Sequence, residues 1–158
     1  MPNPVIYPDA DKDFSSQSPL ILATMCVFGE ARGGSYELQK AVANVIRNRA
    51  IVLCERKRAA SLLDAIKYVV LAKWQFSCFN DNDPNKSKLI VPLQWERPEV
   101  WESCLEAVRT VFVSNASDNT EGATHYFVAS MKVVPIWTDG ATLTVVIDNT
   151  KFFRGVKW

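Results

Sequence analysis

The sequence predicts an α+β fold, in which helices are followed by a small antiparallel sheet. Apolar residues recur at helical spacing in four segments before residue 115, and beyond it apolar and polar residues alternate as they do in strands. A length of 158 residues is that of one domain and is enough to bury a substantial core. We therefore expect an irregular arm at residues 1–17 and a single domain at residues 18–158.

The first helix is predicted to begin after Ser18 and to end at Gly29. Ser18 is a favourable N-cap, and Pro19 suits the first turn because an N–H donor is not needed there. Almost every residue between Pro19 and Gly29 is apolar, which is typical of a buried central helix. Glu30 follows directly beyond the predicted end.

Three amphipathic helices are predicted next. The first begins near Ser35, the second after Ser61, which has capping-box spacing to Asp64, and the third at Pro98. The basic run at residues 55–58 is expected to be a solvated connection. Their apolar stripes contain Leu38, Ala41, Val42, Val45 and Ile46; Ala65, Ile66, Val69 and Val70; and Trp101, Cys104, Leu105, Val108 and Phe112.

The remaining segments predict a long loop and short strands. Residues 74–98 are rich in turn formers and too long for a simple connection, so we expect a loop that serves a site. Strands are predicted at residues 124–128 and 143–147, with Asp139-Gly140 as a turn between them. These strands are expected to edge a cleft.

Composition and charge exclude several classes of protein. A hydrophobic fraction of 48% with 22% charged residues is typical of a globular chain. The net charge of +1 lacks the positive excess of nucleic-acid binders, so no nucleic-acid partner is expected. No apolar run is long enough to insert into a membrane, and the first residues do not have the pattern of an export signal.

We expect no catalytic metal and no cofactor, and the cysteine pattern favours free thiols over disulfides. His125 is the only histidine, whereas most zinc hydrolases use two or three imidazoles. The four cysteines lack CxxC spacing, and three of them fall in apolar helical patterns where a free thiol acts as a small core residue. They are Cys26, Cys54, Cys78 and Cys104.

Glu30 is the leading candidate for a catalytic residue. Its carboxyl group emerges at the end of an apolar helix, where low polarity and the helix dipole both raise a carboxyl pKa. A protonated carboxyl group can donate its proton to a glycosidic oxygen. Pairing with Arg32 would oppose this, and an ordinary helix-end residue fits these observations equally well. A second carboxylate is not singled out among Glu37, Asp81, Asp83, Glu121, Asp139 and Asp148.

Three motifs give the chain a resemblance to a known family. GEARGGSYELQKAVANVIRNR, QFSCFNDNDPN and GATHYF begin at Gly29, Gln75 and Gly122. Their order resembles that in the spore-cortex-lytic, SleB-type cell-wall hydrolases, over about Leu20 to Phe153. The resemblance implies a lysozyme-like fold, mostly helical with a small antiparallel sheet edging a cleft. It also implies cleavage of peptidoglycan between N-acetylmuramic acid and N-acetylglucosamine, usually as a lytic transglycosylase without a metal.

The resemblance also implies roles for individual residues. Glu30 would first protonate the leaving oxygen and then accept the proton of the muramic acid C6 hydroxyl, which closes a 1,6-anhydro ring without a second catalytic carboxylate. Phe76 would stack on a sugar, with a core position as the alternative, and His125 would orient the substrate or Glu30. The residues expected to bind substrate are Gln75, Phe76 and Ser77, and Thr124, His125 and Tyr126.

An Asn-Arg pair and two departures complete the comparison with the family. Asn48 and Arg49 match a family pair that we expect to anchor a loop by hydrogen bonds. Gly34 stands where many members have a second Glu, which leaves Glu37 as a partial substitute. Thr150 stands where the family often has a His. Both departures bear on substrate range and on the choice between ring formation and hydrolysis.

Three other functions stay open. A hydrolytic muramidase would use the same acid, Glu30. A peptidase of the peptide stems would use Cys78 as nucleophile and His125 as base, although nothing strongly electropositive surrounds Cys78 in the sequence. A non-catalytic glycan-binding module would use the aromatic residues Trp74, Phe76, Trp95 and Tyr126.

The cellular setting is predicted only broadly. A compact catalytic domain without an export signal suits a phage endolysin, made in the host cytoplasm and acting at the bacterial cell wall. Truncation of a longer secreted protein is equally compatible with the sequence. We expect a monomer whose partner is the glycan strand of peptidoglycan.

Overall fold

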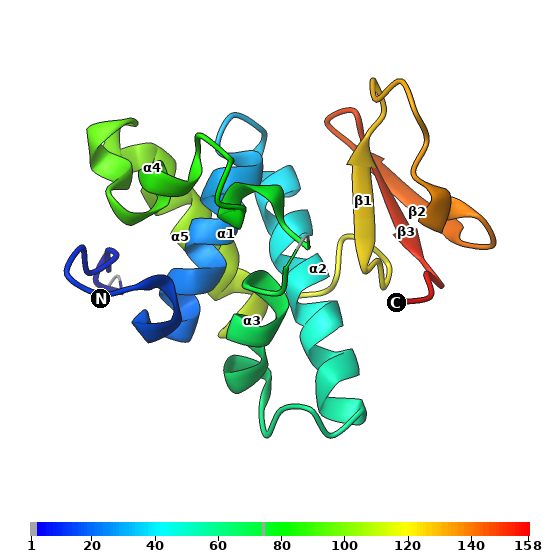
Figure 1. Ribbon diagram of the computed structural model, residues 1–158, viewed down its shortest axis with the longest axis horizontal. Coiled ribbons are helices and arrows are strands. Elements are labelled where there is room, and N and C mark those ends of the chain that lie inside the picture. The colour runs from blue at the N-terminus through cyan, green and yellow to red at the C-terminus, as the bar shows by residue number, and fades with distance from the viewer. Residues whose placement is uncertain (1–2, 74) are drawn as a thin grey trace.

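The computed structural model describes residues 3–73 and 75–158 (Figure 1). In this part of the chain the helices form one body and the strands form a sheet beside it, which confirms the predicted α+β class. The helices are α1 (Pro19–Ala31), α2 (Tyr36–Glu55), α3 (Leu62–Val70), α4 (Lys86–Ile90) and α5 (Pro98–Phe112), and the strands are β1 (His125–Val128), β2 (Thr142–Ile147) and β3 (Thr150–Arg154).

Helix α1 is the centre of the core, and it packs against α2, α3, α4 and α5. The Ser18 hydroxyl accepts a hydrogen bond from the backbone N–H of Ile21, as the N-cap prediction requires. The predicted end at Gly29 is wrong, because α1 continues to Ala31. Gly29 serves a close approach instead, since a Cβ there would lie 2.7 Å from the Cβ of Cys78. Glu30 therefore lies in the last turn of α1.

The other three predicted helices begin where the sequence places them. Ser35 accepts from the N–H of Leu38 at 3.1 Å and caps α2, and Ser61 accepts from the N–H of Asp64 at 3.1 Å and caps α3. Pro98 is the first residue of α5. Helices α2 and α5 pack against each other and against α1, so their apolar stripes close the core around the central helix.

The long loop predicted for residues 74–98 contains short helical segments. Besides α4, it includes 3₁₀ turns at Ser77–Phe79 and Pro92–Gln94. The reason is that the segment carries apolar residues between its turn formers, and two of them, Cys78 and Leu89, are buried in the core with α1. Its turn residues lie between these anchor points.

The sheet differs from the predicted arrangement. Its strand order is β1-β3-β2, so the two predicted strands flank β3, which was not predicted. Asp148 and Asn149 connect β2 to β3, and both have positive φ, as in the tight turns that favour Asn and Asp. Asp139-Gly140 therefore does not join paired strands, although Gly140 has positive φ within the connection from β1 to β2.

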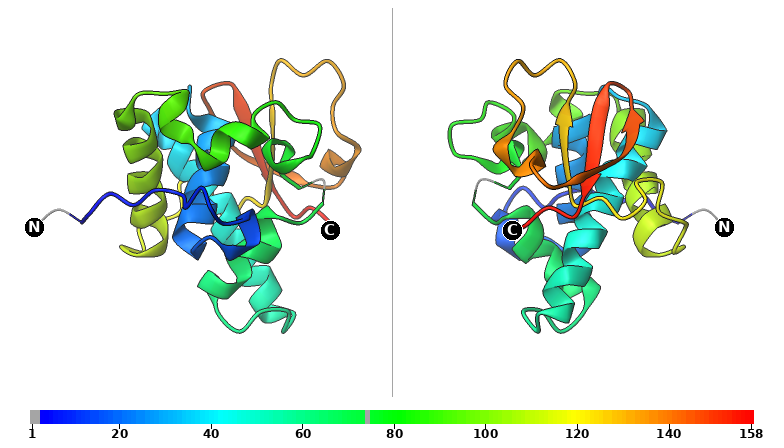
Figure 2. Two further views of the ribbon diagram at one scale, coloured as in Figure 1. Left: turned by 60° about the vertical axis from the view of Figure 1, so that its left-hand side comes forward. Right: turned by 90° about the vertical axis from the view of Figure 1, so that its right-hand side faces the viewer.

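The described part of the N-terminal arm is irregular apart from a 3₁₀ turn at Phe14–Ser16, and it is attached to α5. The indole Nε1 of Trp101 donates to the carbonyl oxygen of Ile6 at 2.8 Å, and the ring of Tyr7 stacks on Trp101. Arg109 donates to the carbonyl oxygen of Pro4. Figures 1 and 2 show the arm on the opposite side of the helical body from the sheet.

Two further expectations concern the whole chain. All four cysteines are free, as predicted, and three of them are buried. None of the helices in the described residues combines the length and the apolar character that crossing a bilayer requires.

The contact at Gly29 predicts a difference between two glycine substitutions. Gly29→Ala places a methyl group against Cys78, so we expect it to lower the free energy of unfolding by about 1–3 kcal/mol. Gly33→Ala is the matched control, because nothing lies within 4 Å of a Cβ at Gly33. Urea unfolding of both variants measures the difference. Equal stability of the two would show that Gly29 is not needed for the close packing of Cys78 on α1.

Candidate active site

Glu30 lies half-buried in the last turn of α1, near groups from α2, from β1 and from the loop before α4. Burial and, to a smaller extent, the carboxylate of Asp83 together raise the pKa of its carboxyl group to about 7. The guanidinium of Arg49 on α2 acts in the opposite direction. The predicted raised pKa of Glu30 is therefore confirmed, and burial is its largest cause.

Arg32 does not form the ion pair with Glu30 that the sequence left open. Its Nε lies 3.3 Å from a carboxylate oxygen of Glu96, and its Nη2 donates to Asn85 at 2.8 Å. Because α1 continues through Ala31, residues 30 and 32 point to different sides of the helix. The carboxyl group of Glu30 is left without this neutralising partner.

Arg49 connects the QFS and THY motifs at the centre of the site. Its side chain is buried, its Nε donates to the carbonyl oxygen of Thr124 at 2.6 Å, and its Nη1 donates to the side chain of Gln75 at 3.1 Å. The guanidinium also lies over the ring of Phe76, 4.8 Å from its centre. Arg49 thus ties the loop after α3 and the start of β1 to α2, which confirms its predicted anchoring role.

Asn48 has the same function one residue earlier. Its side-chain amide donates to the carbonyl oxygen of Ala123 and to the carboxylate of Asp118, each at 2.8 Å. Asp118 in turn accepts from the backbone N–H groups of Thr120 and Gly122. The segment that leads into β1 is therefore held on α2 by side chains of α2.

The three residues of the QFS motif lie in different environments. Gln75 and Ser77 are exposed and have polar groups available to a ligand. Phe76 is only 2% exposed and belongs to the core. The expectation that Phe76 stacks on a sugar is therefore wrong for this structure, because its ring is covered by the core and by Arg49.

The THY residues point to two faces of β1. Tyr126 packs on Phe152, and its pKa is raised by burial and by the nearby Glu30, so it lies on the side of the acid. His125 points the other way, where its ring contacts Trp137 and Trp158. Alternation along the strand separates the two side chains.

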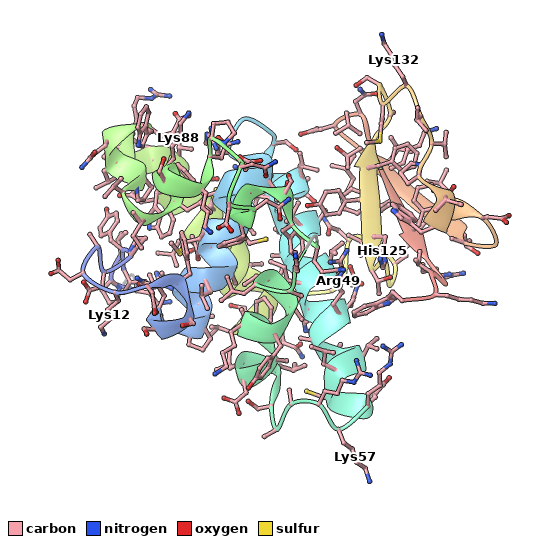
Figure 3. The ribbon with its side chains drawn as sticks, viewed as in Figure 1. Lys12, Arg49, Lys57, Lys88, His125 and Lys132 are labelled. Carbon is pink, nitrogen blue, oxygen red and sulfur yellow. The ribbon has the colours of Figure 1, made fainter. Side chains whose placement is uncertain are left out.

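His125 is held as a structural residue rather than as an orienting group for Glu30. Its Nδ1 shares a hydrogen bond of 2.9 Å with the hydroxyl of Thr124. Burial and the positive charge of Arg49 lower its pKa to about 4, so the ring is neutral at neutral pH. Figure 3 shows His125 beside Arg49. The predicted action of His125 on Glu30 is not supported, because the ring faces the opposite side of β1.

Asp148, in the turn between β2 and β3, lies beside Gly34, one of the two departures from the family pattern. A carboxylate oxygen of Asp148 accepts from the N–H of Ser35 at 2.7 Å and would lie 3.4 Å from a Cβ at Gly34. Glu37 is exposed and paired with Lys40. The carboxylate beside Gly34 is therefore that of Asp148.

The two rival sites are not assembled. Cys78 is 1% exposed and packs on Gly29, whereas His125 packs between two tryptophans on the far face of β1. Of the aromatic residues considered for glycan binding, Trp74 lies outside the described residues. Trp95 is exposed but contacts Lys88, which Figure 3 shows far from Arg49 and His125.

Metal ligands do not gather in the described part of the chain. No group of three or more His, Cys, Asp or Glu side chains is placed there to hold an ion. The titratable groups that interact electrostatically with Glu30 are those of Asp83, Arg49, Tyr126 and Cys26.

Comparison with known proteins gives the family. The family model described as Cell Wall Hydrolase matches residues 33–153, which is most of the chain. The chain belongs to the cell-wall hydrolase family. In this chain the matched residues begin three positions after Glu30. They include Arg49 and the QFS and THY motifs but leave out the candidate acid.

Two solved structures have a similar fold. The catalytic domain of the Bacillus cereus SleB protein is 20% identical, with a TM-score of 0.56 over 96% of this chain and 94% of that chain. The catalytic domain of the germination-specific lytic transglycosylase SleB from Bacillus anthracis is 23% identical, with a TM-score of 0.58 over 88% of this chain and 96% of that chain. The fold is therefore that of SleB catalytic domains. The comparison with curated proteins finds no relative.

Proposed function

We propose that the protein cleaves the glycan strand of peptidoglycan between N-acetylmuramic acid and N-acetylglucosamine, with Glu30 as the acid. The observation that carries the proposal is the carboxyl group of Glu30, whose pKa burial raises to about 7. Membership of the cell-wall hydrolase family and a fold shared with a lytic transglycosylase support the same substrate.

The reaction uses Glu30 twice. The protonated carboxyl group donates its proton to the glycosidic oxygen as the bond from that oxygen to C1 of muramic acid breaks. The resulting carboxylate then accepts the proton of the C6 hydroxyl, whose oxygen attacks C1 and closes the 1,6-anhydro ring. Glu30 is again protonated at the end, and no water is consumed. A pKa near 7 favours this sequence because both forms of the carboxyl group are accessible near neutral pH.

Neighbouring residues support the two states of Glu30 in opposite ways. Arg49 carries a fixed positive charge that favours the carboxylate formed after proton donation, whereas Asp83 favours the protonated form. Gln75 and Ser77 are exposed, and we propose that they bond to sugar substituents. Tyr126 lies on the Glu30 side of β1 and forms part of the same surface.

Asp83 favours a hydrolytic muramidase as the second candidate. It is half-buried and close enough to Glu30 to raise the pKa of that carboxyl group. A second carboxylate near the acid can activate a water molecule, which would then attack C1 in place of the C6 hydroxyl.

The endolysin role, synthesis in the host cytoplasm and the monomeric state stay predictions from the sequence.

Mass spectrometry of the fragments released from purified peptidoglycan tests the proposal. We expect fragments with 1,6-anhydromuramic ends, and a loss of activity on the order of 10²–10⁴-fold in Glu30→Gln. Glu37→Gln is the matched control, because Glu37 is exposed and paired with Lys40, and it should remain active. Reducing muramic ends would favour the muramidase. Cleaved peptide stems, or full activity in Glu30→Gln, would contradict the role of Glu30.

The pH dependence of cleavage should depend on Asp83. Activity is expected to fall as the pH rises through about 7, because Glu30 then loses the proton it must donate. Asp83→Asn removes a negative charge that raises this pKa, so the fall should move to lower pH. Asp81→Asn is the control, since Asp81 is exposed and paired with Lys86. A fall at the same pH in wild type and Asp83→Asn would exclude the proposed influence of Asp83.

A further inference from the structure

A pocket of about 300 Å³ lies next to the candidate active site, along one side of α2. Arg49 and Leu53, one turn apart on the same face of α2, form part of its wall, and Arg58 follows beyond the end of the helix. Tyr68 of α3 and Trp158 also line it. The pocket therefore joins the buried centre of the site to the basic run at residues 55–58.

The charged side chains that line this pocket are cationic. Arg49 and Arg58 line it, and no acidic residue does. Arg56 adds a third guanidinium, 5.2 Å from the ring centre of Trp158. Within the described residues Arg58 is exposed and makes no ion pair, so its charge is available to a ligand. The basic run is therefore more than a solvated connection, because Arg58 lines the pocket and Arg56 contacts Trp158.

The rest of the lining is apolar and aromatic. Leu53 and Val69 are buried and give the pocket an apolar floor. Tyr68 is 54% exposed and Trp158 is 37% exposed, so both rings present surface to a bound molecule. A ligand that fits must therefore combine small apolar groups with negative charge.

The pocket is continuous with the proposed sugar-binding surface. Gln75, the first residue of the QFS motif, lines the pocket and accepts a hydrogen bond from Arg49. Arg49 is in turn close enough to Glu30 to lower the pKa of that carboxyl group. A substrate with its reacting bond at Glu30 can therefore extend a branch past Gln75 into the pocket.

We propose that this pocket binds the peptide stem carried by the muramic acid of the substrate, an inference that rests on the proposed function. Such stems are short, contain alanine and carry free carboxylates. The carboxylates match the exposed guanidinium of Arg58, which can hold such groups by charge-assisted hydrogen bonds, and the positive charge of Arg49 at the inner end of the pocket. The methyl groups match the floor at Leu53 and Val69. The volume suits a few small residues. Stem recognition would position the muramic acid ring at Glu30.

Calorimetric titration with a soluble, sugar-free stem tetrapeptide tests the pocket apart from catalysis. We expect the wild-type protein to bind the peptide, and Arg58→Ala and Tyr68→Ala each to weaken binding by about tenfold. Both side chains are exposed, so neither substitution is expected to unfold the protein. Arg97→Ala is the matched control, because it removes an equally exposed arginine that does not line the pocket. The same peptide with amidated carboxylates should bind about tenfold more weakly than the free acid.

The outcomes separate the pocket from the proposed function. No binding to the wild type, or equal binding by wild type and Arg58→Ala, would overturn the pocket. Binding of a chito-oligosaccharide that depends on Arg58, without binding of the peptide, would also overturn the assignment. The pocket would then be a sugar site. Glycan cleavage without peptide binding refutes the pocket alone, and peptide binding without glycan cleavage refutes the proposed function alone.

Discussion

The buried guanidinium of Arg49 is the interaction on which the rest of the site depends. Arg49 bonds to the start of β1 through Thr124 and to the QFS loop through Gln75, so one side chain of α2 fixes the two segments that face α1. A buried cation is stable only when its hydrogen bonds are made, which couples the packing of the sheet to the helical body. The charge that organises these segments also lowers the pKa of Glu30.

The state of Glu30 follows from competition between burial and charge. Burial disfavours the carboxylate, and Asp83 adds to that effect, while Arg49 limits it. A carboxyl group that must donate a proton and then accept one needs a pKa near the working pH, because a strongly ionised or a strongly protonated group performs only one of the two steps. The helical core and Arg49 together supply this balance without a metal ion in the proposed mechanism.

Much of the helical fold was predictable from local signals. The hydroxyl groups of Ser18, Ser35 and Ser61 cap helices as their spacing indicated, because capping depends only on neighbouring residues. Gly29 misled the prediction of the end of α1, since its small size serves a contact with Cys78, which lies far away in the sequence. The sheet order was missed for the same reason, because strand pairing is a long-range property and the turn at Asp148 gives a weaker signal than Asp139-Gly140.

The site was predictable in part. The raised pKa of Glu30 followed from its place after an apolar helix, and the anchoring role of Arg49 followed from a motif. The burial of Phe76 and the orientation of His125 did not, because a motif records which residues are present but not which side of a loop or strand they face. Asp83 was one of six equivalent carboxylates until the fold brought it near Glu30.

A direct titration of Glu30 by NMR tests whether burial raises the pKa of this carboxyl group to near neutral pH. The signal of the side-chain carboxyl carbon of Glu30, assigned by its loss in Glu30→Gln, is followed as the pH is raised. We expect a midpoint near the pKa of about 7. A midpoint close to the ordinary glutamate pKa of about 4.3 would contradict it, because Glu30 would then be ionised at neutral pH and unable to act as the acid.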